Sequence, residues 1–475
     1  MKTGAATELE VDVAVIGAGT AGLAAYRTAV AVTPRVVIIE AGEHGTTCAR
    51  VGCMPSKLLI AAGDAAHHAR HAGPLGVHAE TVKVDGAEVM ARLRFERDRF
   101  VGFVLEGVAK IPDDRKISGR ARFVAPGVLE VEGRRIHARA IVIATGSSPF
   151  VPPMFEPVRD RLVLNDDVFL WERLPASVAV FGAGVIGLEI GQALSRLGVR
   201  VRTFGHKGTI GPLTDPAVRA SALAAFREEM PLHPNGTVRT VRRVESGVEV
   251  TFDDDDGISR VETFAYALVA AGRKPNLIAI GLEHAGIALD GRGAPVFDRA
   301  TLQAKGAGSS ASSVFIAGDA NDDVPLLHEA ADEGTIAGRN AARFPSVTPG
   351  LRRSLLSITF TEPQIAIAGA TWASLMERKP EADLVVGEID FVAQGRSRVM
   401  LQNRGLGHVY ADRATGRFLG AELVGPRVEH LGHLLAWAHQ QELTVGEMLA
   451  MPFYHPVVEE GLRTALRDAA AKIQQ

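Results

Sequence analysis

The sequence predicts an α/β fold of about three domains, in which two similar strand, turn and helix units precede an α+β domain. A chain of 475 residues favours about three domains, because one domain typically takes roughly 150 residues. A short apolar run, a glycine-rich turn and an apolar helical stretch occur in the same register from Val13 and again from Val178. After Pro349 the sequence changes to alternating segments followed by the helical pattern LGHLLAWAHQQ, which predicts the α+β domain.

The composition excludes several classes of protein. The chain has 52 Lys plus Arg against 55 Asp plus Glu, so its formal charge is −3 and we expect neither nucleic acid nor an anionic membrane as a partner. Hydrophobic residues make up 47% and aromatic residues 5%, which is typical of α/β enzymes. The residues from Met1 to Asp12 do not resemble a signal peptide, and no apolar run of about 18 residues follows. We therefore expect a cytoplasmic protein that acts on small molecules or proteins.

The first unit, VAVIGAGTAG, has the GxGxxG spacing of a dinucleotide-binding turn, with its glycines at Gly17, Gly19 and Gly22. In such a turn the first glycine permits a tight bend, the second lets the backbone approach a pyrophosphate, and the third packs helix on strand. Glu40 ends the next strand, where a carboxylate can accept the hydroxyl groups of an adenosine ribose. The first site is therefore predicted to take a dinucleotide with an unphosphorylated ribose, such as FAD or NAD.

The second unit, VAVFGAGVIG, repeats the spacing at Gly182, Gly184 and Gly187. The chain thus predicts two Rossmann-like dinucleotide-binding domains. The position that matches Glu40 is Gly205, which is followed by His206 and Lys207. The missing acid permits NADP as well as NAD, because an acid would repel a 2′-phosphate. A solvated turn explains His206 and Lys207 equally well.

Three further strands end in glycine-containing turns that we expect to line the nucleotide sites. The first ends at Thr145 and Gly146, the second at Gly272 and Arg273, and the third at Gly318 and Asp319, whose carboxylate can bind a polyol hydroxyl. The segment from Lys305 to Ser313 is a loop of low complexity.

The two cysteines of the chain, Cys48 and Cys53, lie five positions apart in TTCARVGCMPSK. A structural disulfide is the alternative, but so short a loop would add little stability, so the spacing favours redox chemistry. Pro55 and the run after it predict a helix that begins near Cys53, where the helix dipole stabilises a thiolate. Lys57 adds a cation in the first turn of that helix.

Over essentially its whole length the sequence resembles the pyridine nucleotide disulfide oxidoreductases, and within them the dihydrolipoyl dehydrogenases. The motifs that carry the resemblance are GAGTAG, the CxxxxC segment TTCARVGCMPSK, ATG at 144–146, GAGVIGLE at 182–189, GDANDDVPLLHEAADEG from 318, and HPVVEE at 455–460. The resemblance implies an FAD domain at 1–150 and 280–348, an NAD(P) domain at 151–279, and a dimerisation domain at 349–475.

The resemblance also implies roles for individual residues. Cys48 would be the interchange thiol and Cys53 the thiol beside the flavin, while Lys57 and Glu189 would pair near the flavin ring. His455, held by Glu460, would act as acid and base across the interface of a homodimer. The remaining implied cofactor contacts are Thr47, next to the cysteines, Asp319 on the ribityl chain, and Leu327 and His328 at the pyrimidine ring.

The implied reaction is oxidation of dihydrolipoamide, free or on a lipoyl domain of a 2-oxoacid dehydrogenase complex, by NAD through FAD and the cysteines. An NADPH-dependent reductase of another disulfide, resembling glutathione reductase, is one alternative, and a transhydrogenase or quinone reductase is another. A flavin-bound scaffold is a third, although it would not need the two thiols. We expect no metal site, because the histidines at 67, 68, 71, 430, 433 and 439 are not joined by cysteines or clustered acids.

Five positions depart from the usual family pattern, and one of them is Gly205, where typical NAD-using members have an acid. Thr46 stands where a glycine is usual, and Ala49 and Arg50 stand where a Leu-Asn pair is commoner. Val457 replaces a threonine after His-Pro. Arg50 would lower the pKa of Cys48 or attract an anionic substrate if it faced the thiols, and would do neither if it pointed to solvent.

Overall fold

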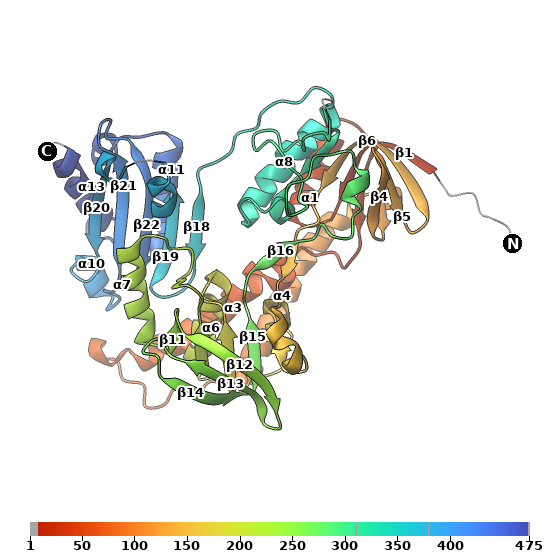
Figure 1. Cartoon of the computed structure of the whole chain (residues 1–475). Coiled ribbons are helices and arrows are strands. Elements are labelled where there is room, and N and C mark those ends of the chain that lie inside the picture. The colour runs from red at the N-terminus through yellow and green to blue at the C-terminus, as the bar shows by residue number, and fades with distance from the viewer. Residues whose placement is uncertain (1–7, 309–310, 379, 474–475) are drawn as a thin grey trace. The chain divides into compact units, whose positions relative to one another are not determined.

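The computed structural model describes residues 8–308, 311–378 and 380–473, which form two compact units (Figure 1). Unit A comprises the described residues up to 55 together with 94–150 and 273–352. Unit B comprises 56–93, 151–272 and the described residues from 353 onward. Part of the low-complexity loop predicted at 305–313, residues 309 and 310, lies outside the described residues.

Unit A is built on a seven-stranded sheet. Its order is β3, β2, β1, β6, β5, β4, with β17 also paired to β6. The strands β3, β2, β1, β6 and β17 pair in parallel, and β4 and β5 form an antiparallel extension. The bounds are β1 (Glu8–Ile16), β2 (Val36–Glu40), β3 (Lys116–Ser118), β4 (Ala121–Ala125), β5 (Val128–Val131), β6 (Arg134–Ile143) and β17 (Val314–Ile316).

The central strands of unit A are apolar because both of their faces are buried. Val13 and Val15 of β1 pack into one hydrophobic cluster, and Ala14 and Ile16 pack into another on the opposite face. Successive side chains of a strand point to opposite faces, so a strand buried on both sides must be apolar at every position. This explains why VAVI and VVII form unbroken apolar runs.

Two helices of unit A lie side by side on one face of the sheet: α1 (Thr20–Val30) and α8 (Leu327–Arg343) (Figure 1). Their backbones approach closely, because a Cβ atom added to Gly334 would lie 2.2 Å from the carbonyl oxygen of Ala21. A short antiparallel pair, β7 (Ser147–Pro149) and β16 (Arg273–Pro275), follows two of the predicted strand ends. The helix α2 (Thr47–Val51) carries Cys48.

Unit B contains a second parallel sheet of the order β11, β10, β9, β15, β8. A three-stranded antiparallel sheet of β12, β13 and β14 follows in the chain. The bounds are β8 (Leu162–Val163), β9 (Ser177–Phe181), β10 (Arg200–Phe204), β11 (Leu232–His233), β12 (Thr237–Val244), β13 (Gly247–Asp253), β14 (Ser259–Phe264) and β15 (Tyr266–Val269). The helices are α5 (Asn165–Val168), α6 (Val185–Arg196) and α7 (Pro216–Arg227).

The C-terminal part of unit B is a five-stranded antiparallel sheet with helices, as expected of an α+β domain. Its strands are β18 (Leu356–Thr359), β19 (Gln364–Gly369), β22 (Phe418–Gly425), β21 (Leu406–Asp412) and β20 (Leu384–Asp390). Its helices are α9 (Trp372–Met376), α10 (Gly395–Val399), α11 (Val428–Gln440), α12 (Val445–Leu449) and α13 (Glu460–Ile473). The predicted fold class is confirmed.

Two helices cross the boundary between the units: α3 (Cys53–Arg70) and α4 (Gly86–Ala109). In unit B, Leu59 of α3 and Met90 of α4 are buried in one cluster with Val180 of β9 and Ile190 of α6. Among the described residues, no helix combines the length and apolar character needed to cross a lipid bilayer.

Candidate active site

The first glycine turn joins β1 to α1 and has the geometry of a phosphate-binding turn. A Cβ atom on Gly17 would lie 2.3 Å from the carbonyl oxygen of Ala144, and one on Gly22 would lie 1.8 Å from that of Gly17. A Cβ on Gly19 would meet no atom within 4 Å. Two glycines are therefore required by close packing, and the third leaves the backbone open to a ligand. Gly19 caps α1 without a side-chain hydrogen bond, so the helix N-terminus is left to an anion.

Glu40 is anchored beside this turn at the end of β2. Its Oε2 accepts a hydrogen bond from the Ala18 amide at 2.7 Å, and its Oε1 accepts one from the Gly42 amide at 2.9 Å. The two amides fix the carboxylate next to the open backbone of Gly19. This is the position from which an acid hydrogen-bonds the hydroxyls of a dinucleotide ribose.

The other predicted residues of the first site lie at strand ends of unit A. Among the described residues, Thr145 Oγ1 is buried without a hydrogen-bond partner. Asp319 accepts a hydrogen bond from Ser147 Oγ at 2.6 Å, and Ser147 in turn accepts one from Arg273 Nε at 2.8 Å. Leu327 and His328 begin α8 and are exposed. The unpartnered hydroxyl, the open Gly19 and the anchored Glu40 together fit FAD.

Glu333, which the sequence analysis did not single out, supports the Gly318 and Asp319 turn. Its carboxylate is fully buried and accepts hydrogen bonds from the Gly318 amide at 2.7 Å and from Asn321 Nδ2 at 2.8 Å. Burial raises the pKa of Glu333, and Arg352 Nη2, 2.7 Å from its Oε1, offsets part of that effect. The helical spacing of α8 in the sequence is the only signal that could have pointed to an inward carboxylate here.

The second glycine turn, between β9 and α6, repeats the geometry of the first. A Cβ atom on Gly182 would lie 2.2 Å from the carbonyl oxygen of Ala270, and one on Gly187 would lie 1.8 Å from that of Gly182. A Cβ on Gly184 would meet nothing within 4 Å, and the same holds for Gly272. The turn fits a second dinucleotide, as the repeated spacing predicts.

The turn after β10 explains why no acid stands at the end of that strand. A Cβ atom on Gly205 would lie 2.7 Å from Pro234 Cα and 3.0 Å from its carbonyl oxygen. The loop after β11 therefore excludes any side chain at 205. His206 and Lys207 are exposed, whereas Arg202 is engaged with Glu262 at 2.6 Å and His233 at 2.7 Å.

The two cysteines lie on consecutive helices joined by Gly52. Cys48 is half-buried on α2, and Cys53 is exposed at the first position of α3. A Cβ atom on Gly52 would lie 3.1 Å from the carbonyl oxygen of Thr47 and 3.2 Å from Cys48 Cα. The glycine thus lets the chain fold back over the first cysteine.

The structure explains two of the departures from the family pattern, Thr46 and Arg50. Thr46 has φ of 60° and ψ of 147°, a conformation that favours glycine, and its Oγ1 accepts the Ala49 amide at 3.3 Å as the cap of α2. Arg50 forms an ion pair with Glu43 and also donates to the carbonyl oxygen of Glu43 at 3.2 Å. Glu43 therefore compensates the charge that Arg50 adds near Cys48.

Lys57 and Glu189 form an ion pair within unit B. Lys57 Nζ lies 2.8 Å from Glu189 Oε2, and the amide of Phe360 donates to Glu189 Oε1 at 2.9 Å. The Lys57 ammonium also lies 4.6 Å from the centre of the Phe360 ring. Glu189 is buried with 4% of its surface exposed, so its charge is compensated by these two donors.

His455 and Glu460 form the pair expected of a base and the group that orients it. His455 Nδ1 lies 3.0 Å from both carboxylate oxygens of Glu460, the first residue of α13. The hydrogen bond to His455 holds the pKa of Glu460 below its usual range. The imidazole is 80% exposed, which leaves Nε2 open to a substrate or a partner chain.

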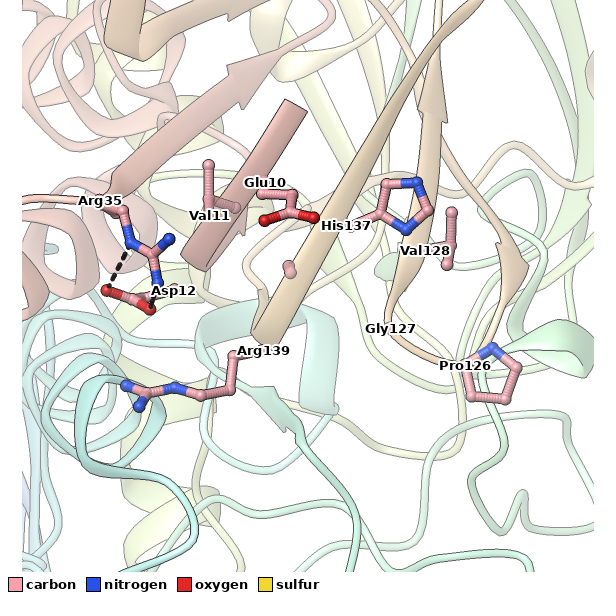
Figure 2. Close-up of a pocket in the computed structure, with 10 residues that line it drawn as sticks. Glu10, Val11, Asp12, Arg35, Pro126, Gly127, Val128, His137 and Arg139 are labelled. Carbon is pink, nitrogen blue, oxygen red and sulfur yellow. Dashed lines mark hydrogen bonds and ion pairs between the residues drawn. The ribbon is translucent and has the colours of Figure 1, made fainter. Parts of the chain in front are cut away.

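A pocket of about 360 Å³ in unit A lies away from the glycine turn (Figure 2). Glu10 to Asp12 and His137 to Arg139 line it, and these residues lie in the middle of β1 and β6, whereas Gly17 follows the last residue of β1. Figure 2 shows Asp12 hydrogen-bonded to Arg35, an interaction that lowers the pKa of Asp12. Within the described parts of the chain, no group of three or more metal-ligating side chains is assembled.

Comparison with known proteins identifies the family. The model of the pyridine nucleotide-disulphide oxidoreductases matches residues 11–334, and that of their dimerisation domain matches 356–466. The chain is 30% identical over 464 residues to dihydrolipoyl dehydrogenase of Thermus scotoductus, covering 96% of each protein. It is also 30% identical over 491 residues to mercuric reductase of Shigella flexneri, covering 100% of this chain and 83% of that protein.

A solved structure agrees with these sequence relatives. LpdA from Mycobacterium tuberculosis superposes with a TM-score of 0.80 at 26% identity and covers 96% of this chain and 99% of its own. The resemblance found in the motifs is confirmed, and the matched dimerisation domain fits a homodimer. The chain therefore belongs to the pyridine nucleotide-disulphide oxidoreductase family, whose enzymes bind FAD and NAD(P).

Proposed function

We propose that this enzyme oxidises dihydrolipoamide with NAD, as a dihydrolipoyl dehydrogenase, through a disulfide between Cys48 and Cys53. The observation that carries the proposal is the arrangement of the chain's only two cysteines. The chain folds back between them at Gly52, and Cys53 begins the helix that bears Lys57. The dihydrolipoyl dehydrogenase of Thermus scotoductus, which aligns over 96% of the chain, supports the same choice of substrate.

The cysteines and His455 perform the dithiol chemistry. The imidazole of His455, oriented by Glu460, accepts a proton from one substrate thiol, and the resulting thiolate attacks the sulfur of Cys48. The bond between Cys48 and Cys53 breaks and Cys53 leaves as a thiolate. The second substrate thiol then loses its proton and displaces Cys48, so the dithiol becomes a cyclic disulfide and both cysteines are reduced. FAD, when bound, supplies the two-electron carrier between these thiols and the pyridine nucleotide.

Other residues of the chain would bind the two cofactors or position the reacting groups. The Gly17 to Gly22 turn, Glu40, Thr145 and Asp319 would hold FAD, and the Gly182 to Gly187 turn would hold the pyridine nucleotide. Lys57, one helical turn after Cys53, would stabilise the Cys53 thiolate, with Glu189 holding the ammonium in place. His455 would serve the cysteines of the partner subunit in a homodimer, and a lipoyl domain would deliver the dithiol.

A second candidate is an NADPH-dependent reductase of another disulfide. It is favoured by the turn after β10, where packing of Pro234 against Gly205 excludes an acid and exposed His206 and Lys207 offer positive charge. Mercuric reductase of Shigella flexneri is a relative at the same identity of 30%, so Hg²⁺ is included among the substrates of the test.

The test is a matrix of purified holoenzyme with NAD and NADP against dihydrolipoamide, and with NADH and NADPH against lipoamide, glutathione disulfide, Hg²⁺ and a quinone. We expect the highest kcat/KM for dihydrolipoamide with NAD. The Cys48→Ser enzyme serves as control and should lose disulfide turnover. A higher kcat/KM for NADPH with glutathione disulfide would contradict the proposal in favour of the second candidate, and a higher value with Hg²⁺ would contradict both.

A further inference from the structure

Two polar layers join α3, α6 and the loop between β18 and β19 within unit B. The first layer contains Lys57 of α3, Glu189 of α6 and the Phe360 amide of the loop. The second layer contains Asp64 of α3, Arg196 of α6 and Glu362 of the loop. In both helices the two layers are seven residues apart, which is about two helical turns, so each helix uses one face for both layers.

Arg196 is the centre of the second layer, and all three nitrogens of its guanidinium donate hydrogen bonds. Its Nη1 donates to Asp64 Oδ1 at 2.6 Å and to Glu362 Oε2 at 2.7 Å. Its Nε and Nη2 donate to the two oxygens of Glu229, which follows α7, at 2.9 and 3.0 Å. The side chain is 3% exposed, so these bonds are shielded from water.

Contacts between the layers tie them into one assembly. Gln192 of α6 donates to the carbonyl oxygen of Glu362 at 2.7 Å and accepts from the Glu362 amide at 2.8 Å. A Cβ atom on Gly63 of α3 would lie 3.1 Å from the carbonyl oxygen and 3.3 Å from the Cα of Ala193 on α6. The two helices therefore touch backbone to backbone between Lys57 and Asp64, and a shift in the second layer is passed on to the first.

The second layer depends on the charge of Arg196. Three carboxylates surround it, and burial raises the pKa of both Asp64 and Glu229, with Arg196 opposing that effect. The neighbouring His67 is neutral at pH 7, because burial and then the charge of Arg196 lower its pKa to about 4. A neutral side chain at 196 would leave these carboxylates uncompensated and would disrupt the layer.

We propose that Arg196 is a positioning residue for the disulfide reaction, which holds α3 against α6 so that Glu189 keeps the Lys57 ammonium in place, one turn from Cys53. This inference rests on the proposed function, in which Lys57 stabilises the Cys53 thiolate. A lysine at 196 keeps the positive charge, but its single ammonium group cannot bridge Asp64, Glu229 and Glu362 as the planar guanidinium does. The substitution therefore loosens the attachment of α3 to α6 without changing the net charge. An alanine at Gly63 pushes α3 from α6 and also leaves the charge unchanged.

The test measures the Cys53 thiol in holoenzyme that carries Cys48→Ser, where Cys53 is the only cysteine. The long-wavelength absorbance of a thiolate beside FAD is titrated with pH, with no turnover required. We expect Arg196→Lys and Gly63→Ala each to raise the midpoint by about one pH unit, because the Lys57 ammonium loses its ion pair with Glu189 and is no longer held beside the sulfur. Bound FAD and the unfolding temperature are recorded for every variant.

Matched controls separate the contacts of Arg196 and Gly63 from the general effects of an Arg-to-Lys exchange and of a change in helix propensity. Arg404→Lys makes the same exchange at a guanidinium that pairs with Glu228 and Glu229 from the more exposed side, and Gly107→Ala makes the same exchange on α4 where a Cβ atom would meet nothing within 4 Å. Both should leave the midpoint unchanged. If Arg196→Lys does not fold, Gly63→Ala decides alone.

The outcomes distinguish the inference from the function on which it rests. No long-wavelength band at any pH in the Cys48→Ser enzyme would overturn the proposed placement of Cys53, and the inference with it. A band whose midpoint is the same in Arg196→Lys, Gly63→Ala and the controls would overturn the positioning role only. An equal shift in Arg404→Lys, which removes a guanidinium from Glu229 and leaves Arg196 in place, would assign the effect to the pairing of Glu229 rather than to the placement of α3.

Discussion

At the scale of single residues, Gly52 decides how the two cysteines are presented. The chain turns back at this residue. A Cβ atom on Gly52 would lie 3.1 Å from the carbonyl oxygen of Thr47 and 3.2 Å from Cys48 Cα, so a side chain there would be crowded. Thr46, on the other side of α2, adopts a backbone conformation that favours glycine and compensates by capping the helix. The segment that carries the two cysteines is therefore specified by backbone geometry at both ends and not by its side chains alone.

We expect Gly52→Ala to slow disulfide turnover by about 10- to 100-fold, because a misplacement of roughly 1 Å between reacting groups has an effect of that size. Reduction of ferricyanide by NADH, which bypasses the thiols, should change little. Stopped-flow and steady-state rates on the same preparation measure both. Gly291→Ala, where a Cβ atom would meet nothing within 4 Å, is the control, and equal disulfide turnover in the two variants would contradict the expectation.

Residues that act within a local pattern could be predicted from the sequence, and residues that act through distant contacts could not. Gly17, Gly22 and Glu40 belong to one short strand, turn and helix segment, so spacing alone indicates their packing. Arg196 and Glu333 look in the sequence like ordinary helical charges, because the partners described above lie outside their helices: Glu362 is 166 residues from Arg196, and Gly318 lies in the turn before α8. The assignment of roles at the predicted site stays a prediction until it is measured.

At the scale of elements, the contact between α1 and α8 connects the first glycine turn to the Asp319 turn. Gly334 and Gly338 of α8 lie against the carbonyl oxygens of Ala21 and Ala25 of α1, one helical turn apart. Small residues at this spacing let two helices approach to backbone contact. The position of α8 therefore fixes both the start of α1 and the turn that Glu333 holds.

Gly334→Ala should release FAD and destabilise the protein by about 1 to 3 kcal/mol or more, because the new Cβ atom would overpack a rigid backbone contact. Bound flavin after purification and the unfolding temperature provide the measurement. Gly102→Ala on α4, with open space around its Cβ position, should keep its FAD. Retention of FAD and stability in Gly334→Ala at the level of that control would refute the argument.

A second contact between elements joins α7 to the C-terminal sheet through His408. Its Nδ1 lies 2.7 Å from Asp215, the cap of α7, and its Nε2 lies 3.3 Å from Glu388 on the neighbouring strand, while Glu422 is its cross-strand neighbour on the other side. Burial alone would lower the pKa of His408, but Asp215 and then Glu388 outweigh that effect and raise it. Hydrogen bonds from His408 and Tyr410 lower the pKa of Asp215 despite its burial.

This pair predicts a loss of stability with rising pH. A raised folded pKa means that the stabilisation by His408 is complete below about pH 6.5 and is lost as pH rises through the folded value. Asp215 stays ionised throughout that window. The unfolding temperature of wild-type enzyme should fall above about pH 6.5 more steeply than that of His408→Gln, and a similar substitution at the exposed His430 should leave the slope unchanged. Parallel pH profiles for wild type and His408→Gln would count against the interaction.

At the scale of the whole molecule, the family resemblance implies that the proposed reaction needs two chains. The cysteines belong to unit A, and His455 with Glu460 belongs to the part of unit B that matches the dimerisation domain. An imidazole 80% exposed is suited to complete a site on another subunit. The division of labour between subunits is implied by the family resemblance and is open to a direct test.

We expect His455→Gln to lower dihydrolipoamide turnover by about 10²- to 10⁴-fold, the usual size of a proton-transfer contribution, with flavin reduction by NADH nearly intact. Mixing His455→Gln subunits with Cys48→Ser subunits should restore activity, because a heterodimer contains one site with both residues. Subunit exchange is verified by mass spectrometry. Exchange without recovered activity, or full activity in a stable monomer, would refute the shared site.

The packing of Pro234 over Gly205 also constrains how this enzyme can change its nucleotide preference during evolution or engineering. In many proteins a single substitution at the end of the second strand adds or removes the acid that reads the ribose. Here a side chain at 205 would collide with a neighbouring backbone, so that first step is blocked until the loop after β11 has moved. The mutational path therefore has an obligatory order: the loop must first carry the backbone of Pro234 away, and only then can a side chain be accommodated at position 205.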